Sequence, residues 1–232
     1  MVLQEKPILE VHDIDASYGQ SRVLFDISLQ LKPNERVAIV GRNGAGKTTL
    51  LKCIAGFLRP TRGSIIYDGI NIVGKRPFEI ARLGLKYIHQ DKGVFQDLTV
   101  RENLELASYA TGDRDWDKVF GYFPRLKALI DRKGANLSGG EKQMLMIGRA
   151  LLGNPKVLLI DEPTEGLAPG VVNDLATIIC GLSVRSALIV VDQNLSFVSK
   201  VAQRVYTMKE GKLVAEISNE QDIRSASYSC HL

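Results

Sequence analysis

The sequence lacks long apolar stretches and has few cysteines. Its longest strongly apolar runs, such as Ala187–Val191, are far shorter than the ~20 residues of a membrane-spanning helix. The three cysteines, Cys53, Cys180 and Cys230, show no C-x-x-C spacing, which argues against a disulfide framework or zinc site and is typical of a reducing compartment. No signal peptide opens the sequence. If the protein acts at a membrane, we expect it to dock onto the membrane-spanning segments of another chain.

Concentrated positive charge is also missing. The formal charge is +4 and the pI is near 8.9, but no basic cluster is denser than Lys75-Arg76. Nucleic-acid-binding proteins usually gather Lys and Arg on one face, so we expect no nucleic-acid partner. The length of 232 residues, with 45% apolar and 24% charged, suits a globular protein of one elaborated domain or two small ones.

Hydrophobic patterns predict two kinds of sheet. Alternation of apolar and polar residues predicts an antiparallel sheet near the N-terminus, in residues 8–11, 25–31 and 64–67. Continuous apolar runs suit parallel strands that are covered on both faces, in residues 35–40, 156–160 and 187–191. The first of these runs leads into a glycine-rich turn and a helix over residues 46–55.

The rest of the chain divides into a helical stretch, a hairpin and a tail. Residues 90–153 have mostly helical patterns, and Glu210-Gly211 between two apolar segments predicts a hairpin over residues 205–217. Residues 219–232 are polar and serine-rich, and we expect at most one helical turn there before the chain frays.

A phosphate-binding loop follows the first parallel strand. The segment Gly41-Arg42-Asn43-Gly44-Ala45-Gly46-Lys47-Thr48 fits the pattern G-x-x-x-x-G-K-[ST]. Glycines let backbone N–H groups wrap phosphates, and the next helix points its positive end at them. The lysine reaches the β- and γ-phosphates, and the threonine hydroxyl is a ligand for Mg²⁺. We expect ATP to contact Gly41, Asn43, Gly44, Ala45, Gly46, Lys47, Thr48 and Thr49.

An acidic pair, Asp161-Glu162, ends the second parallel strand. A carboxylate at the end of a buried strand can face Mg²⁺, and its neighbour can orient or deprotonate the attacking water. A pair that only caps the next turn is the plain alternative, and the phosphate loop in the same chain argues against it. We predict Asp161 as a metal ligand and Glu162 as the catalytic base.

A third motif is Asn136-Leu137-Ser138-Gly139-Gly140-Glu141-Lys142-Gln143. The spacing from Ser138 to Glu141 predicts a capping box before an apolar helix face. The motif has two interpretations: a capped helix and no more, or a helix N-terminus that two glycines clear for a phosphate.

Together and in this order, the three motifs resemble those of the ATP-binding cassette (ABC) ATPases, and the resemblance extends over residues 9–217. It implies an α/β fold: a P-loop NTPase (RecA-like) parallel-sheet core, an N-terminal antiparallel β subdomain and an inserted α-helical subdomain. The expected parts of this single ABC ATPase domain, 1–232, are the core at 1–90 and 153–217, the helical subdomain at 91–152 and the tail at 218–232.

The resemblance also implies roles for single residues. In the family, the third motif contacts the γ-phosphate of ATP held by a second subunit, so Ser138, Gly139 and Gly140 would complete the partner's site in a head-to-tail dimer. Tyr18 matches the aromatic residue that stacks on adenine. Gln90 matches the glutamine that contacts Mg²⁺ or water.

Two positions depart from the family pattern. Gln193 stands where most relatives have a histidine, and its amide can hydrogen-bond the γ-phosphate but cannot carry a positive charge or shuttle a proton. Ala168 stands where many relatives have an aspartate. The expected Mg²⁺ ligands remain Thr48, Gln90 and Asp161. The expected catalytic group consists of Glu162, Gln193 and Gln90. The departures keep a second hypothesis open: a nucleotide-gated assembly subunit with negligible hydrolysis.

Four segments look like those in the ATPases of bacterial importers for branched-chain amino acids and for urea or short amides: residues 122–126, 143–151, 162–169 and 192–194. Those ATPases commonly carry a glutamine at the position of Gln193. That likeness implies an Mg-dependent ATPase that energises uptake of a small polar solute at the cytoplasmic face of the inner (cell) membrane. It also implies three kinds of partner: a second ABC ATPase subunit, identical or not; transmembrane permease subunits, contacted near residues 91–97; and a periplasmic or extracellular solute-binding protein that acts indirectly. A non-transport cassette protein of translation or DNA repair is the remaining alternative, although such proteins usually hold duplicated cassettes or long coiled-coil insertions.

Overall fold

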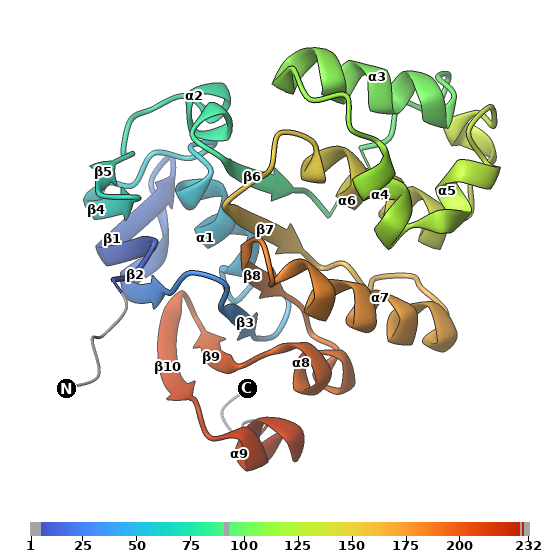
Figure 1. The fold of residues 1–232 in the computed structure, drawn as a ribbon. Coiled ribbons are helices and arrows are strands. Elements are labelled where there is room, and N and C mark those ends of the chain that lie inside the picture. Colours follow the sequence, from blue (N-terminus) through green and yellow to red (C-terminus); the bar gives the residue numbers. More distant parts are fainter. Residues whose placement is uncertain (1–5, 91–92, 228, 230–232) are drawn as a thin grey trace.

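Two sheets organise the protein in the computed structural model, which describes residues 6–90, 93–227 and 229 (Figure 1). From edge to edge, the larger sheet contains β10 (Lys212–Ile217), β9 (Arg204–Lys209), β3 (Arg36–Val40), β8 (Ala187–Val191), β7 (Val157–Asp161) and β6 (Leu85–Ile88). The smaller contains β2 (Ser21–Leu31), β1 (Leu9–Tyr18), β4 (Arg62–Tyr67) and β5 (Ile70–Asn71). Strands β9, β3, β8, β7 and β6 are parallel to one another, whereas β10 pairs with β9 in an antiparallel hairpin. The smaller sheet is antiparallel throughout.

The fold class expected from the sequence is therefore confirmed, and the core explains why the parallel strands are continuously apolar. Successive residues of a strand face opposite sides of its sheet. In β7, Leu158 and Ile160 belong to one buried cluster together with residues of the surrounding helices. Val157 and Leu159 belong to the other, which also includes residues of the antiparallel sheet. Since both faces are covered, no position in β7 favours a polar side chain until its last residue.

Helices surround the parallel strands. They are α1 (Lys47–Ile54), α2 (Pro77–Arg82), α3 (Val100–Thr111), α4 (Asp117–Tyr122), α5 (Pro124–Ala128), α6 (Gly139–Leu151), α7 (Pro169–Leu182), α8 (Leu195–Val201) and α9 (Glu220–Arg224), with a 3₁₀ turn at Gly134–Asn136. Figure 1 shows α3, α4 and α5 together at the end of the molecule opposite the small sheet. The helical stretch predicted around residues 90–153 is therefore present.

The C-terminal tail contains the predicted single helical turn, α9. Residues 228 and 230–232, which include Cys230, lie outside the described residues. Within the described part of the chain, no helix combines the length and the apolar character that crossing a membrane requires.

The start of α6 has the capping box that the sequence predicts. The Ser138 hydroxyl accepts the backbone N–H of Glu141 at 3.3 Å, and the Glu141 carboxylate accepts the N–H of Ser138 at 2.9 Å. Arg125 adds a charged hydrogen bond to the same carboxylate at 2.7 Å. The first turn of α6 is thus fixed by contacts among its own residues and one from α5.

Candidate functional site

The loop between β3 and α1 is a tight turn in which glycines are required by the fold. A Cβ atom on Gly41 would lie 2.4 Å from the carbonyl oxygen of Met208 in β9. Gly44 and Gly46 have φ angles of +81° and +106°, in the region that side chains disfavour. The loop backbone therefore lies close to the sheet at Gly41, and no side chain covers it at Gly44 and Gly46.

The N-terminus of α1 has no side-chain cap. Gly46 is the residue before the helix, and no side-chain hydrogen bond caps the first turn. The first N–H groups of a helix have no acceptor within it, and the helix dipole gives this end a partial positive charge. The loop and helix together thus present backbone donors to an anion.

These donors line a cavity of about 460 Å³. The residues around it are Val23, Asn43, Gly44, Gly46, Lys47, Thr48, Thr49, Gln90 and Glu162. Most belong to the predicted phosphate loop, and Gln90 and Glu162 come from the ends of β6 and β7. Val23, in β2, was not predicted, because an isolated valine in a strand carries no signal beyond packing.

Lys47 is buried beneath the loop, with only 4% of its surface exposed. Its ammonium group donates to the carbonyls of Gly41 at 2.8 Å and Arg42 at 3.1 Å, and lies 3.5 Å from a carboxylate oxygen of Glu162. The cation is therefore held at the junction of the loop and the acidic residue.

Asp161 is the last residue of β7 and faces α1, because it shares a strand face with Val157 and Leu159. Its two carboxylate oxygens accept from different hydroxyls: Oδ1 from Thr48 at 3.1 Å and Oδ2 from Tyr87 at 2.7 Å. Burial raises the pKa of Asp161, and the two hydroxyls oppose that shift. The structure thus brings together Thr48 and Asp161, two of the three predicted metal ligands.

Glu162 adopts a left-handed backbone conformation, with φ +45°, which is uncommon for a residue with a side chain. Its N–H donates to the Val191 carbonyl at 2.8 Å, which fixes the turn after β7 against β8. Strained backbone of this kind concentrates at functional sites. The turn directs the Glu162 carboxylate to Lys47, whereas the neighbouring Asp161 carboxylate reaches Thr48.

Two glutamine amides meet at Glu162. Gln90 Nε2 lies 3.2 Å from Glu162 Oε2 and 2.9 Å from Glu165 Oε2. Gln193 Nε2 lies 3.4 Å from Glu162 Oε1 and 2.6 Å from Asn43 Oδ1. In the predicted catalytic group, Gln90 and Gln193 therefore each contact Glu162.

Asp192, which sequence reasoning did not single out, ties the loop after β7 to the loop after β8. Its buried carboxylate accepts from the Thr164 hydroxyl at 2.9 Å, the Thr164 N–H at 3.2 Å and the Asn194 N–H at 2.8 Å. Burial raises the pKa of Asp192, and these hydrogen bonds oppose the shift. The network fixes the loops on which Glu162 and Gln193 lie. An acidic residue ending an apolar strand was its only sequence signal.

Four predicted residues lie elsewhere. Tyr18 ends β1 and is 47% exposed, while Ser138, Gly139 and Gly140 lie at the N-terminus of α6. Among the described residues, none of these four lines the cavity at the phosphate loop. Within one chain, the loop and the Ser138 motif are therefore separate features.

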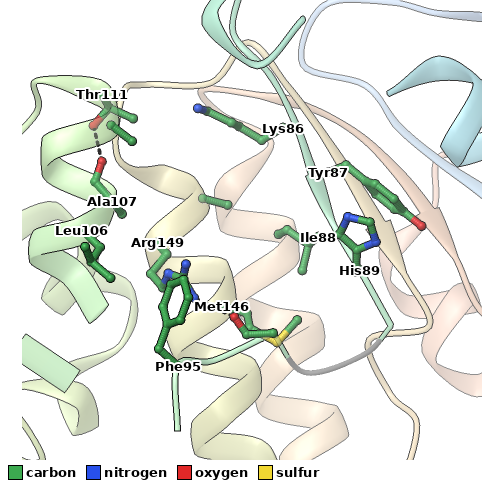
Figure 2. Close-up of a pocket in the computed structure, with 13 residues that line it drawn as sticks. Lys86, Tyr87, Ile88, His89, Phe95, Leu106, Ala107, Thr111, Met146 and Arg149 are labelled. Carbon is green, nitrogen blue, oxygen red and sulfur yellow. Dashed lines mark hydrogen bonds between the residues drawn. The ribbon is translucent and has the colours of Figure 1, made fainter. Parts of the chain in front are cut away.

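A second hollow, of about 480 Å³, lies between β6, α3 and α6 (Figure 2). Phe95, 49% exposed, lies on its wall, with the Arg149 guanidinium 4.8 Å from its ring centre. Arg149 also donates to the Gly93 carbonyl at 2.7 Å. Asp91 and Lys92, part of the segment expected to contact a permease, lie outside the described residues.

The donors at the phosphate loop suit Mg²⁺ only when phosphate oxygens join them. No cluster of three His, Cys, Asp or Glu side chains able to hold a metal occurs in the described residues. Mg²⁺ commonly binds through one or two carboxylates together with substrate phosphates and water. The Thr48 hydroxyl and the Asp161 carboxylate fit that pattern, beside a loop built for anions.

Comparisons with known proteins agree with this geometry. A family model described as ABC transporter matches residues 24–165. The chain is 38% identical, over 212 residues, to the high-affinity branched-chain amino acid transport ATP-binding protein BraG of Pseudomonas aeruginosa, covering 89% of this chain and 91% of that protein. It is 34% identical, over 221 residues, to the lipopolysaccharide export system ATP-binding protein LptB of Haemophilus influenzae, covering 92% of each. A crystal structure of an ATP-binding cassette of an ABC transporter in its ADP conformation aligns with a TM-score of 0.86 at 27% identity, over 97% of this chain and 96% of that one.

Proposed function

Since this chain belongs to the ABC transporter family and is one of its ATPases, we propose that it energises the uptake of a small polar solute. The observation that carries the proposal is the contact of Lys47, Glu162 and two glutamine amides around one cavity at a phosphate loop. The 38% identity with BraG, a branched-chain amino acid transport ATP-binding protein, supports a solute of that kind. Import, and a urea or amide as the alternative solute, rest on the likeness of residues 122–126, 143–151, 162–169 and 192–194 to the ATPases of such importers.

We assign the phosphates of ATP to the loop N–H groups and to Lys47. Thr48, Asp161 and Gln90 would hold Mg²⁺, which when bound neutralises charge on the phosphates. Glu162 orients or deprotonates the attacking water, because its carboxylate lies at the mouth of the loop. The amides of Gln90 and Gln193 hold that carboxylate, and Gln193 donates to the γ-phosphate.

A second ATPase subunit, identical or a paralogue, would supply the other half of each site. Ser138, Gly139 and Gly140 lie at the positive end of a helix of 13 residues, outside their own chain's cavity. Such a helix end binds anions, so we propose that it contacts ATP held by the partner. Tyr18 would stack on adenine from the hairpin between β1 and β2.

The hollow between β6, α3 and α6 is our proposed contact with the permease on the cytoplasmic face of the inner membrane. It is close to Gln90 along the chain, since Ile88 and His89, which directly precede Gln90, line it. Its wall includes two exposed apolar side chains, Phe95 and Leu106, and exposed apolar side chains that lie together suit a docking surface. A periplasmic or extracellular solute-binding protein would act through the permease, without contact with this chain.

The test is Glu162→Gln in the purified transporter complex. Without a carboxylate base, we expect ATP binding to persist while hydrolysis falls about 10²- to 10⁴-fold, the usual contribution of general base catalysis. Glu165→Gln is the matched control: it also removes a carboxylate that contacts Gln90, but Glu165 is exposed and forms no ion pair with Lys47. Its hydrolysis rate should stay within a few-fold of the parent protein.

Gln193 favours a second candidate function, a nucleotide-gated subunit in which ATP binding matters and hydrolysis is negligible. An amide at this position cannot carry a positive charge or shuttle a proton. Unchanged ATPase and transport in the Glu162→Gln complex would refute the catalytic role and leave gating as the function of this chain.

A further inference from the structure

Tyr87 contacts the proposed metal site from β6, and neither the motifs nor the comparisons assign it a role. Its hydroxyl lies 2.7 Å from Asp161 Oδ2, while the Thr48 hydroxyl lies 3.1 Å from Asp161 Oδ1. Each oxygen of the buried carboxylate therefore has its own donor. One donor comes from the phosphate loop helix and the other from a neighbouring strand.

The register of the sheet explains the contact. Tyr87 is paired with Leu159 in the parallel β6–β7 ladder, and Asp161 lies two residues further along β7 on the same face. A tyrosine is long enough to reach such a diagonal neighbour. Its ring packs against His89, with centroids 4.0 Å apart, and against Phe57 at 5.9 Å. Figure 2 shows Tyr87 and His89 next to each other at the end of β6.

We propose that Tyr87 is a positioning residue for ATP hydrolysis, whose hydroxyl fixes the rotation of the Asp161 carboxylate so that Oδ1 stays directed to Thr48. The inference rests on the proposed function, because it needs Asp161 and Thr48 to share one Mg²⁺. The packed ring holds the hydroxyl in place, and the hydroxyl holds Oδ2. Loss of an outer partner of this kind typically costs 10- to 100-fold in metal affinity.

The test uses the full-length protein with Tyr87→Phe, which keeps the ring and its packing and removes only the hydroxyl. Mn²⁺ binding is followed by the loss of the free Mn²⁺ signal in electron paramagnetic resonance at a fixed ATP concentration, and the loss with ATP alone is subtracted because ATP itself binds Mn²⁺. We expect Mn²⁺ affinity to fall about 10- to 100-fold. ATP affinity in EDTA should stay within about twofold, because the phosphate loop is untouched.

Tyr67→Phe is the matched control. Tyr67 is fully buried and donates to the Leu83 carbonyl at 3.3 Å rather than to a carboxylate. Loss of the Tyr67 hydroxyl should lower thermal stability without changing Mn²⁺ affinity.

The KM for Mg²⁺ in hydrolysis should rise in Tyr87→Phe, with kcat recovering at saturating Mg²⁺.

The outcomes separate the two levels of the proposal. If Tyr87→Phe binds Mn²⁺ with ATP as tightly as the parent protein, the hydroxyl only satisfies a buried carboxylate and the positioning role is refuted. If the parent protein binds no Mn²⁺ with ATP, the proposed function itself fails, and this inference with it. Weaker Mn²⁺ binding in Tyr87→Phe, with Tyr67→Phe unaffected, supports the positioning role.

Discussion

Ser138 has two roles to separate: it caps α6, and it is proposed to contact ATP held by a partner subunit. Substitutions to alanine and to aspartate distinguish them. Alanine removes the hydroxyl that accepts the Glu141 N–H. Aspartate is as good an N-cap as serine, but it adds a negative charge at the position proposed to face the γ-phosphate.

The magnitudes differ enough to measure. Loss of the cap in Ser138→Ala should lower the free energy of unfolding by about 0.5–2 kcal/mol, or roughly 1–8 °C in Tm for a protein of this size. Ser138→Asp should stay within about 1 kcal/mol of the parent protein, because the cap is kept while the new charge lies near Glu141. Like charges brought together at an interface cost several kcal/mol, so assembly-dependent ATPase should fall about 100-fold or more.

Three assays separate these effects: urea unfolding, ATP binding by the isolated chain, and ATPase of the assembled transporter well below the Tm of each variant. We expect Ser138→Asp to bind ATP normally as an isolated chain and to lose turnover in the assembly. Thr99 offers a matched control, because it caps α3 in a second capping box, with Glu102. Thr99→Asp should leave ATPase intact.

Two outcomes would contradict a phosphate contact at Ser138. A folded, assembled Ser138→Asp complex with normal ATPase would show that Ser138 only caps its helix. Equal losses in Ser138→Asp and Thr99→Asp would show that any charge at a helix start impairs the assembly, which would also remove the support for a phosphate contact.

Three further predictions concern the loop and its supports. Lys47→Ala should weaken ATP binding about 10- to 150-fold by calorimetry, since a charge-assisted hydrogen bond is worth ~1.5–3 kcal/mol; unchanged affinity would contradict its assignment. Gly211→Ala should lower the free energy of unfolding in urea by at least ~2 kcal/mol. Gly211 has φ +75°, and an added Cβ would lie 2.0 Å from the carbonyl oxygen of Val23. Its N–H also donates to the Ala45 carbonyl in the phosphate loop. Gly69→Ala, at φ +78° with nothing within 4 Å, should show only the smaller strain cost. Burial raises the pKa of Asp192, so folding favours its protonated form. The contribution of this group to stability is therefore present below pH ~4 and is lost as pH rises through the native pKa. We expect the stability of the parent protein relative to Asp192→Asn to fall over that range, and a rise would contradict the burial argument.

The sequence predicted the fold where local pattern and tertiary environment agree. The continuous apolar runs became β3, β7 and β8, because both faces of the parallel sheet are covered. The first strand was predicted as residues 8–11 but extends over Leu9–Tyr18. Its register shifts after Val11, next to the left-handed Asp13, and such a bulge breaks the alternation on which the prediction depended.

Other elements escaped prediction because their stability comes from distant partners. Strand β6 has only four residues and includes Lys86 at its second position, so it carries little apolar periodicity. It forms because β7 supplies a parallel neighbour. The residues that support the site share this property: Tyr87 reaches Asp161 across 74 positions of sequence, and Asp192 reaches Thr164 across 28. No spacing rule covers such separations.

The glycines around Ser138 show where a motif alone misleads. Glycines at the N-terminus of a helix suggest room for a phosphate. Gly140, however, also lies against α7 of its own chain, where an added Cβ would lie 2.8 Å from Val171 Cγ1. Packing of α6 against α7 therefore disfavours a side chain at this position, whether or not a phosphate approaches. The case for a cross-subunit contact depends instead on Ser138 and on the positive end of α6. A charge placed at Ser138 is for that reason a sharper probe of the contact than any substitution at Gly140.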